Sequence, residues 1–398
     1  LDDLRKCIEA GGGPQAESLY RRLQNISSDT PTQTTQSPVI PVTFEETAEK
    51  AGLVHSLINK TSGEKYLIET MAGGVATFGD GLVDIFFTNG ADIPSFRKTN
   101  PSQWNRLYQN EGNFQFRDVT EQMRVAGDGF STGVTVGDFN GDGRPDFFVS
   151  GYGKSLLYRN DGTHFSEIST QAGLKQQPWP ITAGWFDYDN DGHLDLLIVN
   201  YLDWSPTKNI FCGDSKASFR VYCHPKHFAP LSNVLYRNRG DGTFEDVTEK
   251  SGLSQFPGKG MSVAFADYDN DGWQDIFITN DAIPNSFFRN RGNGTFEEIA
   301  LTAGVALTDD GAAISSMGVD FRDYDNDGLP DLAITALVGE TFPLFRNMGK
   351  GVFTDWSIRS QLAKVSKPFS GWGIHLADLN NDGWKDIFTA NSHVTDNI

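Results

Sequence analysis

The nine residues Asp267-Tyr-Asp269-Asn-Asp271-Gly272-Trp-Gln-Asp275 recur in closely similar form five times along the chain, beginning at Asp138, Asp187, Asp267, Asp323 and Asp378. Carboxylate or amide oxygens stand at positions 1, 3, 5 and 9 of each copy. The glycine at position 6 allows the backbone to turn sharply, so these oxygens and the carbonyl of position 7 can converge. Such a set of oxygens suits a hard cation, and the spacing therefore predicts five metal-binding loops.

The ion that fits these loops best is Ca²⁺, and we expect about five of them. An EF-hand would place glutamate at position 12, where this chain has Val149, Ile198, Ile278, Ile334 or Thr389. Magnesium prefers fewer carboxylates and retained water, and zinc prefers histidine or cysteine. Isolated Asp-Asn-Gly sequences are often solvated turns, but five copies with one spacing favour calcium. The predicted ligands are Asp138, Asn140, Asp142, Arg144 and Asp146; Asp187, Asp189, Asp191, His193 and Asp195; Asp267, Asp269, Asp271, Trp273 and Asp275; Asp323, Asp325, Asp327, Leu329 and Asp331; and Asp378, Asn380, Asp382, Trp384 and Asp386.

Charge and composition narrow the class of protein. The net charge is -19, which disfavours nucleic acid and anionic membranes as partners. The aspartate loops account for much of this charge, and their carboxylates would repel one another without counter-ions. No apolar stretch is long enough for a transmembrane helix, so we expect no direct membrane span. The 29 phenylalanines are ample for a folded core.

A second phrase alternates with the aspartate loops, as in Phe244-Glu-Asp-Val-Thr, and it usually follows a Tyr-Arg-Asn sequence such as Tyr236-Arg237-Asn238. Successive loops begin 49, 80, 56 and 55 residues apart, which leaves room for about four short strands in each repeat. Apolar runs follow every loop and helical periodicity is nearly absent after residue 55. The pattern predicts an all-β fold, a β-propeller with six repeats and six or seven blades. A shortened relative of the loop, Asp80 to Asp84, is predicted to bind no ion.

The segments outside the repeats carry further expectations. Residues 1–41 read as a short helical arm, with helices at 2–10 and 15–24, followed by a Ser/Thr/Pro-rich linker, and residues 42–398 read as the propeller. The longest interval holds an insertion at about residues 203–231. The first Phe phrase, at Phe44, has no loop before it, so its strand could complete the last blade; alternatively, the chain is truncated before a last blade.

Cysteine usage points to a compartment. Cys212 and Cys223 lie eleven residues apart in the polar insertion, which suits a disulfide better than two reduced thiols. Cys7 would then be free or paired with another chain. A disulfide and calcium sites together favour a secreted, periplasmic or cell-surface location.

The phrase Val134-Thr-Val-Gly-Asp-Phe-Asn-Gly-Asp-Gly-Arg-Pro-Asp-Phe-Phe-Val resembles the FG-GAP/VCBS repeat. The array from Phe44 to Ile398 is similar to bacterial members of the cartilage acidic protein family. Three further phrases also resemble sequences of that family: Tyr66-Leu-Ile-Glu-Thr-Met-Ala-Gly-Gly74, Tyr222-Cys-His-Pro and Asn391-Ser-His-Val. The resemblance implies a seven-bladed, integrin-α-like propeller with calcium in its loops, often followed by an ASPIC/UnbV domain. The chain departs from the family in its shortened first loop and in stopping before that domain.

Three functions remain open from the sequence. The first is a protein-interaction or scaffold module outside the cytoplasm, rigidified by calcium. The second is a carbohydrate lyase or dehydratase on a propeller scaffold, for which His224, His227, His375 and His393 are candidate residues and Trp179, Trp185 and Trp204 could stack on sugar rings. Packing between blades is the simpler role for these tryptophans. The third is a peripheral subunit of a membrane-associated complex, docked through residues 1–41.

Overall fold

The computed structural model describes residues 42–59, 62–71, 73–79, 81–214 and 219–393. The chain divides after Thr43, and the unit that begins at Phe44 holds all of the repeats. The predicted arm of residues 1–41, including Cys7, and Asp80 of the shortened loop lie outside the described residues. In the part of the chain that is described, no helix is long and apolar enough to cross a bilayer.

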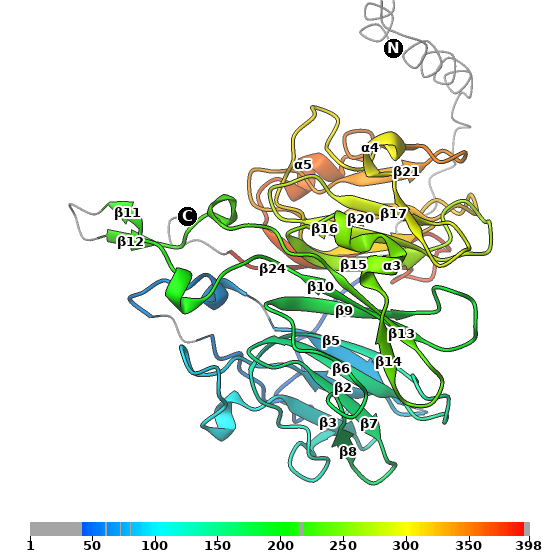
Figure 1. Ribbon diagram of the computed structural model, residues 1–398. Coiled ribbons are helices and arrows are strands. Elements are labelled where there is room, and N and C mark those ends of the chain that lie inside the picture. Colours follow the sequence, from blue (N-terminus) through cyan, green and yellow to red (C-terminus); the bar gives the residue numbers. More distant parts are fainter. Residues whose placement is uncertain (1–41, 60–61, 72, 80, 215–218, 394–398) are drawn as a thin grey trace, which may run out of the picture. The chain divides into compact units, whose positions relative to one another are not determined.

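Each repeat forms one antiparallel sheet, and successive repeats form successive sheets (Figure 1). Five sheets have four strands and the sixth has two. The aspartate loop always joins the first strand of a sheet to the second, which begins at position 9 of the loop. The strands are β1 (Val75–Phe78), β2 (Asp84–Phe87), β3 (Arg106–Asn110) and β4 (Phe116–Asp118); β5 (Phe130–Gly137), β6 (Asp146–Tyr152), β7 (Leu156–Asn160) and β8 (Phe165–Glu167); β9 (Pro180–Phe186), β10 (Asp195–Asn200), β13 (Val234–Asn238) and β14 (Phe244–Asp246); β15 (Gly260–Ala266), β16 (Asp275–Asn280), β17 (Ser286–Asn290) and β18 (Phe296–Glu298); β19 (Val319–Arg322), β20 (Asp331–Ile334), β21 (Leu344–Asn347) and β22 (Phe353–Asp355); and β23 (Gly371–Ala377) and β24 (Asp386–Asn391).

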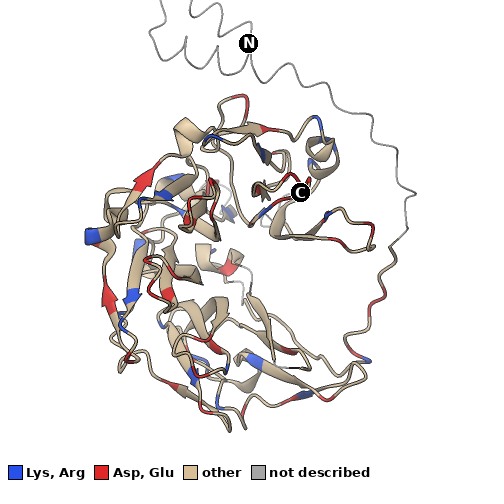
Figure 2. Ribbon diagram, turned by 90° about the vertical axis from the view of Figure 1, so that its right-hand side faces the viewer, with Lys and Arg blue, Asp and Glu red and all other residues tan. Residues whose placement is uncertain are grey.

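The sheets are arranged around a common centre (Figure 2), and their first strands line it. Each of β1, β5, β9, β15, β19 and β23 contributes residues to a central cavity of about 280 Å³, and each packs against the next one along the chain. Radial sheets with their first strands at the centre are the blades of a β-propeller. The fold class expected from the repeats is therefore confirmed, with six blades in the described chain.

The sixth blade consists of β23 and β24 alone. The Phe44 phrase, which was one of two candidates to complete the last blade, forms no strand in the described residues 42–50. Its ring does reach the blade, because the centroids of Phe44 and Phe388 in β24 lie 6.1 Å apart. The phrase therefore lies beside the last blade without pairing with it.

Apolar side chains hold adjacent blades together. In the second to fifth blades the second strand is buried on both faces, as in β16, where all six residues are buried. Phe277 contributes to the cluster between the fourth and fifth blades, and Ile276 and Ile278 contribute to the cluster between the third and fourth. Burying such a side chain stabilises the fold by roughly 1.5–3 kcal/mol. This two-sided burial explains the uninterrupted apolar runs that follow the first four aspartate loops.

Helices are short and lie in the connections. They are η1 (Leu67–Thr70), η2 (Pro101–Gln103), η3 (Pro206–Lys208), η4 (Pro225–His227), α3 (Thr248–Ser251), η5 (Leu253–Gln255), α4 (Ala300–Ala303) and α5 (Leu362–Ser366). The insertion between β10 and β13 also carries a small hairpin, β11 (Cys212–Asp214) and β12 (Phe219–Val221), which projects away from the blades (Figure 1).

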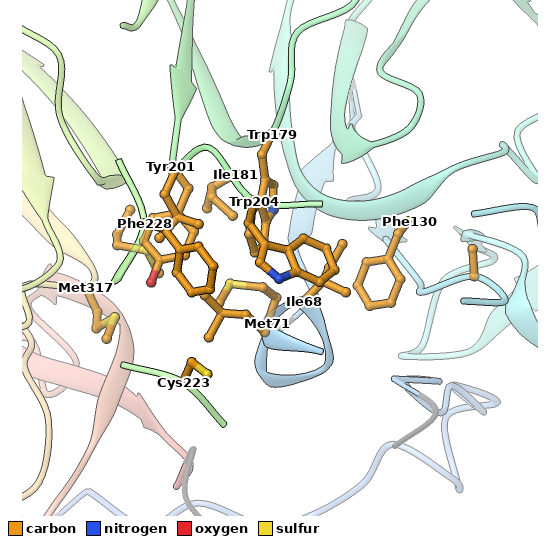
Figure 3. Packing of buried hydrophobic residues seen from close by; sticks show 14 residues of the cluster. Ile68, Met71, Phe130, Trp179, Ile181, Tyr201, Trp204, Cys223, Phe228 and Met317 are labelled. Atoms are coloured by element: carbon orange, nitrogen blue, oxygen red, sulfur yellow. The ribbon is translucent and has the colours of Figure 1, made fainter. Parts of the chain in front are cut away.

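A separate cluster joins the insertion and η1 to the inner ends of the blades (Figure 3). Trp179 and Trp204 lie within it, with exposed fractions of 0% and 3%, and their ring centroids are 5.2 Å apart. Trp185 packs between blades against Phe139 and Phe244. All three tryptophans therefore pack against other side chains, but only Trp185 packs between blades as the sequence favoured.

Replacing Gly318 with alanine is expected to destabilise the propeller by about 1–3 kcal/mol, because the new methyl group would overpack the contact between the fifth and sixth blades. A Cβ at Gly318 would lie 2.1 Å from the carbonyl oxygen of Trp372. The measurement is the urea midpoint. The matched control is Gly373→Ala, whose Cβ would meet only Ala390 at 3.8 Å; it should change stability by less than about 0.5 kcal/mol. Equal effects of the two substitutions would contradict the prediction.

Candidate metal centres

The five loops share one backbone arrangement, shown here for the loop of the fourth blade. The carboxylate of Asp267 accepts hydrogen bonds from the amides of Asp271 and Gly272, at 3.0 and 2.8 Å. Asp271 in turn accepts one from the amide of Trp273 at 3.0 Å. Gly272 has a φ of +90°, which a residue with a Cβ rarely adopts. The loop therefore turns at position 6, as the spacing predicted.

The three middle loops bring their carboxylates together. In each, oxygens from three aspartates lie within 4.8 Å of one another. Ligand oxygens 2.3–2.6 Å from a calcium ion are separated by at most about 5.2 Å, so one ion can contact all three. The groups are Asp187, Asp189 and Asp195; Asp267, Asp269 and Asp271; and Asp323, Asp325 and Asp331.

In each of these loops, one carboxylate oxygen at position 3 is placed to bind a cation. The Oδ1 atoms of Asp189, Asp269 and Asp325 are buried and have no hydrogen-bond partner among the described residues. An unpaired carboxylate oxygen away from water costs free energy unless a donor or a cation satisfies it. The donor set contains hard oxygen atoms only, so it fits a calcium ion. The residues present therefore suit the ion that the sequence predicts.

The aspartate at position 9 ties the loop to the sheet. Asp275 is fully buried, and its two oxygens accept the amides of Tyr268 at 3.1 Å and Asn290 at 2.8 Å. Burial raises the pKa of Asp275 to about 7, although these hydrogen bonds oppose the shift. The same shift, with the same cause, occurs at Asp146, Asp195 and Asp331. A nearby divalent cation would favour the ionised form of each carboxyl group.

The third strand supplies partners that the sequence reasoning missed. Arg237 contacts position 3 of its loop, Asp189, at 2.7 Å and position 5, Asp191, at 2.8 Å. Arg289 and Arg346 make the equivalent contacts in the next two blades. These arginines offset part of the loop charge. The recurring Tyr/Phe-Arg-Asn phrase was the available signal, and it forms the end of the third strand.

The asparagine of that phrase connects neighbouring blades. The side-chain amide of Asn290 donates to the carbonyl of Gln274 in its own loop at 3.2 Å and to the carbonyl of Tyr188 in the preceding blade at 2.8 Å. Asn347 bridges in the same way to Pro330 and Tyr268. The position of one metal loop is thereby coupled to the next.

The two outer loops, which begin at Asp138 and Asp378, differ from the three middle loops because their position 3 is asparagine. Asn140 and Asn380 each accept the backbone amide of position 5, at 3.0 and 2.9 Å. In the first loop the side chain of Arg144 pairs with Asp142, 2.5 Å away, although we expected only the backbone oxygen of position 7 to matter. These two loops keep the turn but gather fewer charges.

The shortened loop of the first blade retains one of these interactions. Asp84, its last residue, accepts the amide of Asn110 in β3 at 2.8 Å, as position 9 does with the third strand in the second to fifth blades. The sheet connection therefore persists where the ligand positions have been lost.

The FG-GAP-like repeat matches the chain in five segments, residues 78–149, 138–198, 229–278, 267–334 and 335–389. The chain belongs to this family. Each matched segment includes an aspartate loop or ends shortly after one, so the FG-GAP repeat of this chain corresponds to the loop and the strands around it. The family resemblance seen in the sequence is confirmed.

Curated relatives of this FG-GAP protein include cartilage acidic protein 1. The human protein is 27% identical over 282 residues, which are 66% of this chain and 38% of that protein. The protein from Xenopus tropicalis is 27% identical over 281 residues, which are 66% of this chain and 39% of that protein. The match therefore spans less than half the length of these relatives.

Solved structures show weaker similarity to this FG-GAP protein. A lectin from Agrocybe aegerita that recognises non-reducing terminal N-acetylglucosamine is 17% identical, with a TM-score of 0.44, 80% of this chain covered and 75% of the lectin. A rhamnogalacturonan lyase from Bacillus licheniformis is 12% identical, with a TM-score of 0.38 and coverages of 80% and 55%. Similarity at this level does not transfer a function.

The insertion of this FG-GAP protein contains the disulfide that the sequence predicted, between Cys212 and Cys223. Of the candidate catalytic histidines, His224 lines a cavity that also contains Asp281, whereas His227, His375 and His393 do not line it. His375 instead pairs with Asp320 at 3.1 Å. The structure therefore brings one of the four candidate histidines, His224, together with a carboxylate in this cavity.

Proposed function

We propose that this chain is an extracytoplasmic calcium-binding propeller that acts as a protein-interaction module. The observation that carries the calcium assignment is the buried, unpaired Oδ1 of position 3 in three consecutive loops, each beside other carboxylates. An ion there would satisfy these oxygens and hold the turn in one conformation. Because Asn290 and Asn347 link successive loops, order in one loop would also help to order its neighbour.

The proposed location rests on two features. A disulfide persists in oxidising compartments outside the cytoplasm. Extracellular calcium modules have dissociation constants of about 10⁻⁴ to 10⁻³ M, so their loops are occupied where calcium is abundant. The Cys212–Cys223 bond and the five loops therefore support the same surroundings.

The insertion supports the interaction role. Ile210, Phe211 and Phe219 are exposed by 41%, 48% and 51%, and they lie on or beside the projecting hairpin of β11 and β12. Grouped apolar side chains on a protruding element are typical of a contact surface. We expect a protein partner to cover them.

Two measurements test this function. Isothermal titration with Ca²⁺ on metal-free protein should show about five sites, with little heat from Mg²⁺.

Cross-linking capture from the native source should recover the same protein partner each time when wild-type protein is used in calcium. The partner should be lost in EDTA, and it should also be lost when the Phe211→Ser, Phe219→Ser double variant is used. Absence of calcium binding would refute the metal assignment. Partner capture that is indifferent to both changes would refute the interaction role.

A further inference from the structure

A second, smaller cavity lies where the insertion meets the inner ends of the blades. Its volume is about 180 Å³, and its walls are largely apolar. The lining includes Met71, Met261, Met317, Trp372 and Cys223, whose disulfide to Cys212 holds this wall of the insertion. Figure 3 shows Met71, Met317 and Cys223 in the same part of the buried cluster. Drug-sized sites span roughly 300–1,000 Å³, so this cavity suits a ligand of few atoms.

One carboxylate oxygen in this cavity has no well-formed hydrogen bond to the residues that the structure describes. Asp281 is only 5% exposed, and its Oδ2 accepts a hydrogen bond of 2.5 Å from the Tyr201 hydroxyl. Its other oxygen, Oδ1, is buried and accepts no hydrogen bond of good geometry in the described part of the chain, although the nearby Ser315 hydroxyl, like that of Tyr201, lowers the pKa of this carboxyl group. Carboxylate oxygens buried in this way are normally paired, so this oxygen calls for a donor from outside the chain.

The charges around Asp281 favour a cationic donor. Burial lowers the pKa of His224, whose imidazole is therefore neutral at neutral pH. Lys259, 5% exposed, donates to the carbonyl of Pro225 at 2.8 Å. Glu340 accepts the amides of Ser315 and Leu337, each at 3.1 Å. Burial raises the pKa of both Asp281 and Glu340 and lowers that of Lys259. When both carboxyl groups are ionised, two negative charges face one ammonium group.

We propose that this cavity binds a small primary ammonium compound with an apolar body. Its ammonium group donates a hydrogen bond to Oδ1 of Asp281 and supplies the missing positive charge. Its apolar part packs against Met71, Met317 and Trp372. This site is separate from the aspartate loops and goes beyond the proposed calcium-dependent function.

The methionines provide a direct test on the full chain. The chain has five, of which Met71, Met261 and Met317 line the cavity, while Met123 and Met348 do not. With [¹³C-methyl]methionine-labelled protein in saturating calcium, benzylamine should shift the three cavity methyl signals and leave the other two unchanged. Benzyl alcohol, which has nearly the same shape but no charge, should bind about 10- to 100-fold more weakly.

A variant identifies the recognising group. Asp281→Asn preserves the side-chain shape and should lower benzylamine affinity by about 10- to 100-fold. The matched control is Asp203→Asn, which makes the same charge change at an exposed insertion residue paired with Lys208. This variant should bind benzylamine with the affinity of wild-type protein. Equal affinity for amine and alcohol in wild-type protein, or shifts at all five methionines, would overturn the proposal even if Asp281→Asn fails to fold. Amine binding unaffected by Asp281→Asn would overturn it as well.

Discussion

Removing calcium with EDTA is expected to lower the Tm of this protein by about 10 °C. At a calcium concentration ten times Kd, one occupied site adds roughly 1.4 kcal/mol of stability, so five sites add roughly 7 kcal/mol. For a unit of about 355 residues, this free energy corresponds to a shift of about 10 °C. The physical reason is that the aspartates repel one another when no cation lies between them. Differential scanning calorimetry with and without calcium measures the shift.

The control for this experiment is magnesium. Mg²⁺ demands octahedral geometry at shorter distances and gives up its water reluctantly, so it should restore only a small part of the lost Tm. Chelated protein that is returned to calcium should regain the original value. The same Tm in EDTA and in calcium would mean that the loops are stable turns without an ion.

The Asp275→Ala substitution is expected to cost roughly 3–6 kcal/mol, because two buried hydrogen bonds to a charged group are lost and each contributes roughly 1.5–3 kcal/mol. The amides of Tyr268 and Asn290 would be left without their acceptor inside the protein. The fourth blade should also lose its calcium site. Urea unfolding in saturating calcium measures the stability, and calorimetric titration counts the remaining sites.

A matched control is Asp241→Ala. Asp241 is also an aspartate in a turn and accepts the amide of Thr243 at 2.9 Å, but it lies on the surface outside the metal loops. Its replacement should change stability by less than about 0.5 kcal/mol and leave the calcium count unaltered. A comparable loss for both variants would show that position 9 acts only as a turn residue.

Local features of this protein could be predicted well. The order of oxygens over nine residues, the glycine with φ of +90° at Gly272 and the apolar run from Asp275 all follow from short-range rules of backbone and burial. The propeller followed from the repetition of those features. The disulfide of Cys212 and Cys223 followed from their spacing in a polar insertion.

The errors and omissions concern contacts between distant segments. Of the two possibilities left open for the last blade, a strand at Phe44 does not form, although the ring of Phe44 reaches Phe388. The roles of Arg237 and Asn290 went unrecognised, because a Tyr/Phe-Arg-Asn phrase shows nothing in itself about which loop its side chains will meet. Of the histidines singled out, only His224 reaches the cavity of Asp281.

The amino-acid sequence by itself determined the five loops, their donor atoms and the repeating sheets, because each depends on residues within a few positions of one another. Only the tertiary structure decided that Asn290 meets the carbonyl of Tyr188 and that Tyr201 meets Asp281. These pairs are separated by 102 and 80 residues. Their contacts depend on how blades stack around the centre, and local periodicity carries no information about that stacking.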